Sequence, residues 1–277
     1  MKKKKILTGL LLLLLLLSGC GSKPLPDEAQ NIYQIPVIPT AEERESEEVE
    51  LTNAFKATAF YTELAENADV FICDTWNYGI IEGKPRYEHN EYPLASVEVD
   101  SYGHSIRVSK NYFRHNPIET SDGSDLISNF VDADNTLNVL VPEQYRLREQ
   151  EISDAYLDRF YFDKIEVENI YNERQGRPLN STGKDGLNIH IIYVKDGQSY
   201  FTFNKEIAVK TGYRITDPVV MIYTANIHPI QTYSMMSRAF FLYSEAQDAV
   251  EAYEEIGPYA EKNDIADIFK EVRVLEE

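Results

Sequence analysis

Cysteine is nearly absent from this 277-residue sequence, which contains only Cys20 and Cys73. If Cys20 carries a covalent modification, Cys73 has no partner and no disulfide can form within the chain. The fold must then depend on its hydrophobic core, even in a compartment that permits disulfides. Cys73 follows an apolar triplet at residues 70–72. This setting favours a buried thiol over a catalytic nucleophile, which needs an activating base beside it.

Positive charge is also scarce in this sequence. Lysine and arginine number 27 against 46 aspartates and glutamates, so the formal net charge is -19. Cleavage after residue 19 would remove the four lysines at residues 2–5 and make the mature chain more acidic. A surface of this sign repels nucleic acid and anionic lipid head groups, so neither is an expected partner.

Catalytic and metal-binding motifs are missing. The five histidines do not occur at zinc-ligand spacing, and the acidic turns near Asp122 and Asp134 lack the glycine of an EF-hand loop. Surface turns are the favoured explanation of these acidic residues, with calcium binding as the alternative. Ser181 and Lys184 have the spacing of a penicillin-recognising serine site, but a turn follows them where a helix should begin. We therefore expect no enzyme activity, no cofactor and no metal site.

Long hydrophobic runs are absent as well. The apolar stretch at residues 6–17 has 12 residues, whereas a membrane-spanning helix needs about 20. It follows four lysines and leads into a Leu-Ser-Gly-Cys sequence that ends at Cys20. This order is typical of a secretory signal and resembles the lipobox of bacterial lipoproteins. We predict a signal peptide at residues 1–19 and lipid on Cys20, which would anchor the protein at the extracytoplasmic face of the cell membrane.

The chain after Cys20 predicts a tether followed by one domain. Residues 20–39 contain four prolines among polar residues and are expected to form a flexible, lipid-anchored tether. Residues 40–277 are expected to form a single extracytoplasmic domain. Thr40 and Glu43 match a capping box, so a helix is expected from there to about residue 64. The expected buried face of this helix consists of Leu51, Phe55 and Ala59.

Strand-like segments follow this helix. Strands are expected at residues 70–73, 95–99, 105–108, 136–141 and 219–223, where apolar and β-branched residues are frequent. Asp196 and Gly197 separate two further runs, at residues 187–194 and 199–203, and predict a two-residue hairpin. The first arm of this hairpin is apolar on both faces, which predicts a central position in the sheet.

Helix-like segments alternate with these strands. A helix is expected to begin at Pro142 and to bury Ile152, Tyr156 and Phe160. Another is expected from Ser244 to Gly257, with Ala246, Val250 and Tyr253 on its buried face, and a short last helix carries Ile265 and Phe269. These elements predict an α/β (α+β) fold, with a single mixed, largely antiparallel sheet packed with helices.

From about residue 68 onward, short motifs occur in an order that resembles a known family. The motifs are Ala68-Asp69-Val70, Asn77-Tyr78, Tyr92-Pro93-Leu94, Asn111-Tyr112, Asn116-Pro117-Ile118, Leu140-Val141-Pro142-Glu143, Tyr200-Phe201-Thr202-Phe203-Asn204 and Asp217-Pro218-Val219-Val220. Their order is similar to that in the extracytoplasmic loop of bacteriocin-associated integral membrane proteins, which are ABC-transporter permeases of Gram-positive bacteria. Such permeases carry membrane helices on both sides of this loop, whereas here the predicted lipid on Cys20 replaces the first of them.

The resemblance implies a non-enzymatic accessory or docking module of an ABC export or bacteriocin-related system. The implied partners are an ABC permease or an exported peptide, together with the membrane through Cys20. Trp76, Tyr78 and Tyr112 are the candidate partner-binding residues, because aromatic side chains carry much of the binding energy at interfaces. The alternative is a free-standing peptide- or solute-binding lipoprotein, which a pocket lined by tyrosines and Trp76 would favour.

Overall fold

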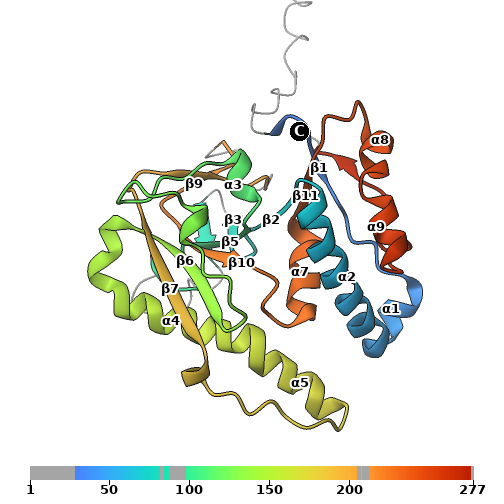
Figure 1. Ribbon diagram of the computed structural model, residues 1–277, viewed down its shortest axis with the longest axis horizontal. Helices are drawn as coiled ribbons and strands as arrows, with labels where there is room; N and C mark the ends of the chain where they lie inside the picture. The colour runs from blue at the N-terminus through green and yellow to red at the C-terminus, as the bar shows by residue number, and fades with distance from the viewer. Residues whose placement is uncertain (1–28, 82–83, 88–97, 205–206, 208–211, 276–277) are drawn as a thin grey trace, which may run out of the picture.

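A computed structural model describes residues 29–81, 84–87, 98–204, 207 and 212–275 (Figure 1). At its centre lies an eight-stranded mixed sheet in the order β12-β1-β11-β2-β5-β10-β6-β7. Its neighbouring strands are antiparallel except for the pairs β5–β10 and β6–β7, which are parallel. This arrangement confirms the predicted mixed, largely antiparallel sheet. The strands are β1 Ile32–Gln34, β2 Val70–Asp74, β5 Ser105–Ser109, β6 Thr136–Pro142, β7 Asn188–Val194, β10 Val219–Tyr223, β11 Phe240–Tyr243 and β12 Arg273–Val274.

Two small antiparallel sheets and a set of helices surround the main sheet. The small sheets pair β3 Tyr78–Ile81 with β4 Lys84–Tyr87, and β8 Ser199–Phe201 with β9 Arg214–Thr216. The helices are α1 Ala41–Glu45, α2 Glu47–Asn67, α3 Tyr112–His115, α4 Glu149–Tyr161, α5 Val167–Arg174, α7 Pro229–Ala239, α8 Ala249–Glu254 and α9 Gly257–Lys262. A π-helical turn at Phe162–Glu166 joins α4 to α5.

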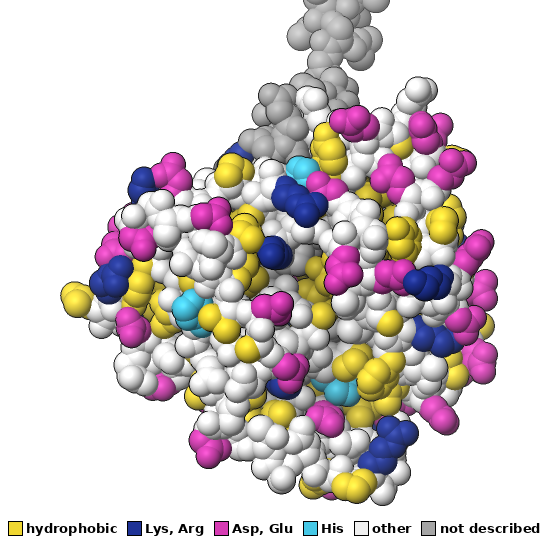
Figure 2. Space-filling view, in the orientation of Figure 1, with side chains coloured by type: hydrophobic (Ala, Val, Ile, Leu, Met, Phe, Trp, Pro, Cys, Tyr) yellow, Lys and Arg dark blue, Asp and Glu magenta, His cyan; other side chains and the backbone are white. Residues whose placement is uncertain are grey.

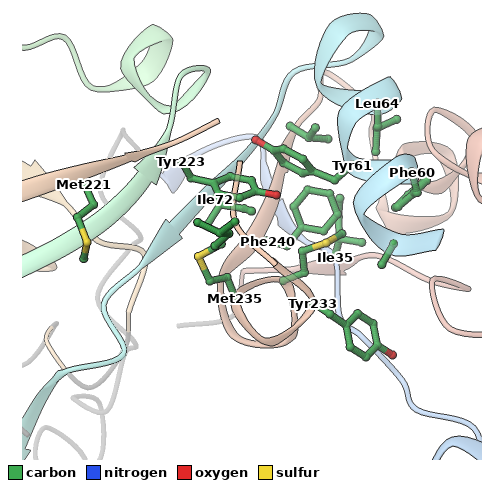
Figure 3. Close-up of a cluster of buried hydrophobic side chains, with 14 of the residues drawn as sticks. Ile35, Phe60, Tyr61, Leu64, Ile72, Met221, Tyr223, Tyr233, Met235 and Phe240 are labelled. Atoms are coloured by element: carbon green, nitrogen blue, oxygen red, sulfur yellow. The ribbon is translucent and has the colours of Figure 1, made fainter. Parts of the chain in front are cut away.

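Each face of the main sheet has its own hydrophobic core, because side chains alternate along a strand. In β2, Val70 and Ile72 pack with α2, α4 and α7 in the first core. Figure 3 shows part of this core, where Tyr61 of α2 packs against Tyr223 and Phe240, and Phe60 packs against Phe240. The intervening β2 residues Phe71 and Cys73 point to the second core, which α3 and β8 cover. The predicted burial of Cys73 is confirmed, at 1% exposure.

The helix predicted to begin at Thr40 forms as two pieces. The Thr40 hydroxyl accepts a hydrogen bond from the Glu43 amide and caps α1, as predicted. A second cap at Ser46 then starts α2. The predicted buried face is wrong beyond Leu51, because Phe55 is 53% exposed. A spacing of three and four residues from Leu51 places the core residues Ala54, Ala57, Phe60, Tyr61 and Leu64 on the buried face instead.

The predicted boundary between tether and domain is wrong. Strand β1 lies inside the predicted tether and pairs with β11 on one side and β12 on the other. Ile32 and Ile35 are buried at 3% and 0% exposure, so hydrophobic burial holds this segment in the domain despite the prolines around it. The predicted signal peptide at residues 1–19, Cys20 and the tether up to residue 28 lie outside the described residues.

The predicted hairpin at Gly197 is also wrong. Strand β7 pairs in parallel with β6 at the edge of the main sheet, and β8 pairs with β9. Gly197 does occupy a turn with a φ of 77°, but the chain after it crosses to the second face. Tyr200 and Phe201 are buried there at 0% and 1% exposure. We infer that burial of these two rings determines which strand β8 pairs with. A local turn motif contains no information about this burial.

Helix boundaries differ from the predicted ones in three places. Pro142 ends β6, and a 3₁₀ turn at Glu143–Arg148 precedes α4, although the predicted burial of its apolar side chains is confirmed. Asp248 rather than Ser244 caps α8, where Val250 is 74% exposed, and Gly257 begins α9 instead of ending a helix. Ile265 and Phe269 are buried in turns rather than in a helix. The strand predicted at residues 95–99 falls mostly outside the described residues.

Candidate binding sites

The three predicted partner-binding residues lie in different surroundings. Tyr112 is fully buried in the second core, and its hydroxyl donates to the Phe201 carbonyl at 2.9 Å. The prediction that Tyr112 anchors a partner at the surface is therefore corrected. Trp76 is half-buried and Tyr78 is 8% exposed. These two residues line one hollow of about 360 Å³, here called the Trp76 hollow.

The Trp76 hollow contains no activated nucleophile or base among its described residues. The Asp74 carboxylate, whose side chain is 2% exposed, accepts two hydrogen bonds from Arg238, at 2.8 and 3.3 Å. The Cys73 thiol points to the Phe201 carbonyl at 3.6 Å, and burial raises its pKa well above the ordinary value. A protonated, enclosed thiol is a poor nucleophile. The hollow thus offers aromatic walls and a paired guanidinium.

A larger concave site runs along α5. It consists of two adjoining pockets of about 540 and 470 Å³, and Tyr171 of α5 lines both. We call them the His228 pocket and the Glu50 pocket, and together the α5 groove. Figure 1 shows α2 and α7 side by side opposite α5, and Figure 2 shows hydrophobic side chains beside a histidine between α2 and α5. Elements far apart in the sequence therefore build the two walls.

Stacked rings form one wall of the His228 pocket. The Tyr171 and His228 rings are nearly parallel, with centroids 5.5 Å apart and an interplanar angle of 7°. Phe55 meets the His228 ring edge-on at 6.1 Å. Phe55 is therefore exposed because it lines this pocket instead of packing in the core. These three rings form an aromatic wall, with Phe55 set at a steep angle to the other two.

The His228 side chain also has a defined hydrogen-bonding state. Its Nδ1 accepts from the Ile230 amide at 3.3 Å and caps the start of α7, where Pro229 occupies the first turn. Burial lowers the pKa of His228, with a smaller opposing effect from Glu168. The ring is therefore neutral at pH 7 with its proton on Nε2. Nε2 makes no hydrogen bond within the described part of the chain, so it remains a donor for a ligand.

Polar groups surround the rings of the His228 pocket. The Gln175 Oε1 atom is buried and receives no hydrogen bond from any residue that the structure describes. Lys164 is already used, because it pairs with Asp134 at 2.8 Å and donates to the Asn226 carbonyl. Arg177 is exposed at the rim, and no ion pair of its side chain is found among the described residues. The pocket thus combines an apolar wall with a few unused hydrogen-bonding groups, which is the usual composition of a ligand site.

The charged side chains that line the Glu50 pocket are Glu43, Glu50 and Arg174. Glu43, at 7% exposure, accepts from the Tyr233 hydroxyl at 2.6 Å and from the Asn53 amide at 2.9 Å. Glu47 pairs with Arg174 at 2.7 Å. Burial raises the pKa of Glu50, and repulsion from Glu43 and Glu47 raises it further. Within the described chain, the Glu50 side chain has no ion pair and no hydrogen bond.

The side chains of the calcium-like and serine-site-like motifs make structural contacts within the protein. The Asp122 carboxylate accepts from the Ser124 amide and hydroxyl in a local turn. Lys184, near Ser181, pairs with Asp158 at 2.6 Å. Across the described ranges, no three His, Cys, Asp or Glu side chains converge as a metal site requires. No helix in these ranges combines the length and the apolar character of a membrane span.

No protein-family model, characterised protein or solved structure significantly matches the chain. The resemblance to the permease loop therefore stays a prediction, and the site has to be interpreted from its own chemistry.

Sequence reasoning did not find the α5 groove. From the sequence, the five histidines, His228 among them, are considered only as zinc ligands, for which their spacing is wrong. A signal was present in His228-Pro229, because a proline in the first helical turn marks the preceding residue as a cap. The partners Phe55 and Tyr171 lie on α2 and α5, and no spacing in the sequence connects them to that cap.

Proposed function

We propose that the chain is a non-enzymatic, lipid-anchored binding protein at the extracytoplasmic face of the membrane, and that its ligand occupies the α5 groove. The observation that carries the proposal is this groove, in which three aromatic rings and several unused polar groups line adjoining pockets of about 540 and 470 Å³. Ligand sites are typically concave, largely apolar and of about 300–1,000 Å³. Of the two functions expected from the sequence, the geometry favours the peptide- or solute-binding lipoprotein.

Docking to an ABC permease is the second candidate. The half-buried Trp76 supports it, because it lies at a surface hollow with Tyr78 beside it. Burial of Tyr112 counts against it, since the expected aromatic surface patch loses one of its three members. Crosslinking in intact cells distinguishes the two functions. Recovery of a permease subunit that is lost in Trp76→Ala would support docking, and recovery of a soluble ligand would support the binding protein.

The groove is tested by what the protein retains on purification. The full chain, extracted from membranes in mild detergent, is analysed for co-purified small molecules and peptides by mass spectrometry. Phe55→Ala removes one ring of the wall, whereas Val250→Ala removes a similarly exposed side chain from α8, outside the groove. We expect Phe55→Ala to lower the retained amount about tenfold, equivalent to about 1.4 kcal/mol, with no change in Val250→Ala. Equal retention by the two variants would show that the ligand site lies elsewhere.

A further inference from the structure

We propose that the α5 groove takes an extended peptide segment, with an apolar side chain in the His228 pocket and a cationic side chain beside Glu50. The inference rests on the proposed function and specifies its ligand class. It follows from three properties of the groove: its division into two pockets, the aromatic wall of one pocket and the charge of the other.

The shape of the groove favours a chain molecule over a compact solute. Each pocket exceeds 400 Å³, and Tyr171 lines both pockets from the same helix. A ligand that fills both must therefore pass along α5 and place different groups on either side of this ring. An extended peptide does this naturally, because successive side chains along it project to separate positions.

The His228 pocket suits an apolar or aromatic side chain. Phe55, Tyr171 and the neutral His228 ring provide its apolar wall. Among the described residues, groups beside this wall that make no hydrogen bond include the Nε2 donor of His228 and the Oε1 acceptor of Gln175. A peptide backbone offers both a carbonyl and an amide to such groups. Arg177, at the rim, can bind a backbone carbonyl or a terminal carboxylate.

The Glu50 pocket suits a cation. Glu43 and Glu47 lie close enough to Glu50 that their charges, after burial, raise the pKa of its carboxyl. Glu43 is held by the neutral donors Tyr233 and Asn53, and Glu47 pairs with Arg174. Glu50 has no partner of its own in the described part of the chain and lines the pocket half-buried. A lysine or arginine side chain of a ligand would neutralise it, whereas an anion would meet further repulsion.

Short synthetic peptides test the ligand class. The peptides carry an N-terminal acetyl group, one lysine and one phenylalanine, separated by one to four alanines. Matched peptides replace lysine by glutamate or by alanine, or phenylalanine by alanine. Binding to the full chain in detergent is measured by isothermal titration calorimetry. We expect one spacing to bind best, and each replacement to weaken its binding about tenfold or more.

Variants locate the cationic contact. Glu50→Gln should weaken binding of the lysine peptide about tenfold. Binding of the matched peptide with alanine in place of lysine should not change. Glu48→Gln makes the same charge change on an exposed position of α2 outside the groove, and should have no effect. Equal binding of the glutamate and lysine peptides, or an equal effect of the two variants, would overturn the inference.

The proposed function and the ligand class fail separately. If no peptide of the series binds but a co-purified molecule is lost in Phe55→Ala, the ligand class is wrong and the binding function stands. If the peptides bind equally to wild type and Phe55→Ala, peptide binding occurs outside the groove and the ligand class is wrong. The binding function fails as well if Phe55→Ala and Val250→Ala retain equal amounts of co-purified material.

Discussion

The Asp163 carboxylate lies 2.6 Å from the Arg107 guanidinium and ties the π-helical turn before α5 to strand β5. Both side chains are almost completely buried, and Arg159 donates to the same carboxylate oxygen at 2.9 Å. The backbone carbonyl of Asp163 accepts from the His228 amide at 3.0 Å. One residue therefore connects the sheet, the start of α5 and the start of α7. This connection holds the start of α7, with His228, beside the turn that leads into α5.

Asp163→Asn should be strongly destabilising. It leaves two buried guanidinium groups without a counter-charge, and breaking a buried ion pair by removing one partner costs about 3–5 kcal/mol. Chemical denaturation of wild type and variant measures the loss. Asp154→Asn is the control, because Asp154 is exposed on α4, and a surface change of this kind costs at most about 0.5 kcal/mol. Similar stabilities of the two variants would contradict a structural role for this pair.

Stability should fall on acidification partly because of His228. Burial lowers the pKa of His228 in the folded state, whereas an unfolded histidine titrates near pH 6.5. The unfolded state therefore takes up protons first, so this contribution is present above about pH 6.5 and is lost as the pH falls toward the folded pKa. His228→Asn keeps a capping side chain but removes the titration. Between pH 7 and 5, chemical denaturation should show that the variant loses less free energy of unfolding than wild type. Equal losses would show that titration of His228 does not contribute to the acid sensitivity.

Cys73 should react with thiol reagents only when the chain unfolds. The thiol is 1% exposed, and burial raises its pKa well above the ordinary value. For a domain stable by about 5 kcal/mol, maleimide labelling in buffer should be at least about a thousandfold slower than in denaturant. Mass spectrometry follows the modified fraction with time. Labelling of the folded protein within minutes would mean that the thiol is accessible and would revive a catalytic role for it.

Gly197→Val should destabilise the turn between β7 and β8, although the turn is not a hairpin. The φ of 77° at Gly197 is strained for a residue with a Cβ atom, while the space around it is open. Strain of this kind costs about 1–3 kcal/mol. Gly197→Asn should cost less, because asparagine tolerates positive φ better than valine does. Thermal melts compare the two variants, and an equal loss would show that strain at this residue is not the cause.

Lipid attachment at Cys20 is a prediction from the sequence alone. Radiolabelled palmitate fed to cells that produce the protein should label the wild type and not Cys20→Ala. The variant should also remain uncleaved or be released from the membrane, because two or more acyl chains normally hold such a protein stably. Wild-type protein without label would contradict the anchoring and with it the proposed location.

The sequence alone was sufficient for features that depend on local composition. Strands at Val70–Asp74 and Val219–Tyr223 follow from nearly continuous apolar runs, because a strand covered on both faces is rich in apolar side chains. Strands at Ser105–Ser109 and Thr136–Pro142 also carry apolar residues, but Arg107 and Asn138 within them are polar and buried. The Thr40 cap and the burial of Cys73 follow from their immediate neighbours. Each of these features involves residues within one or two turns or one strand.

Tertiary structure decided which of these pieces pair and what the surface presents. The parallel pairing of β6 with β7, the burial of Tyr112 and the place of β1 in the sheet each depend on contacts between distant segments. The α5 groove depends on such contacts most of all, since α2, α5 and α7 are separated by many residues. Local propensity cannot specify these arrangements, because the free energy that selects among them comes from apolar area buried between elements.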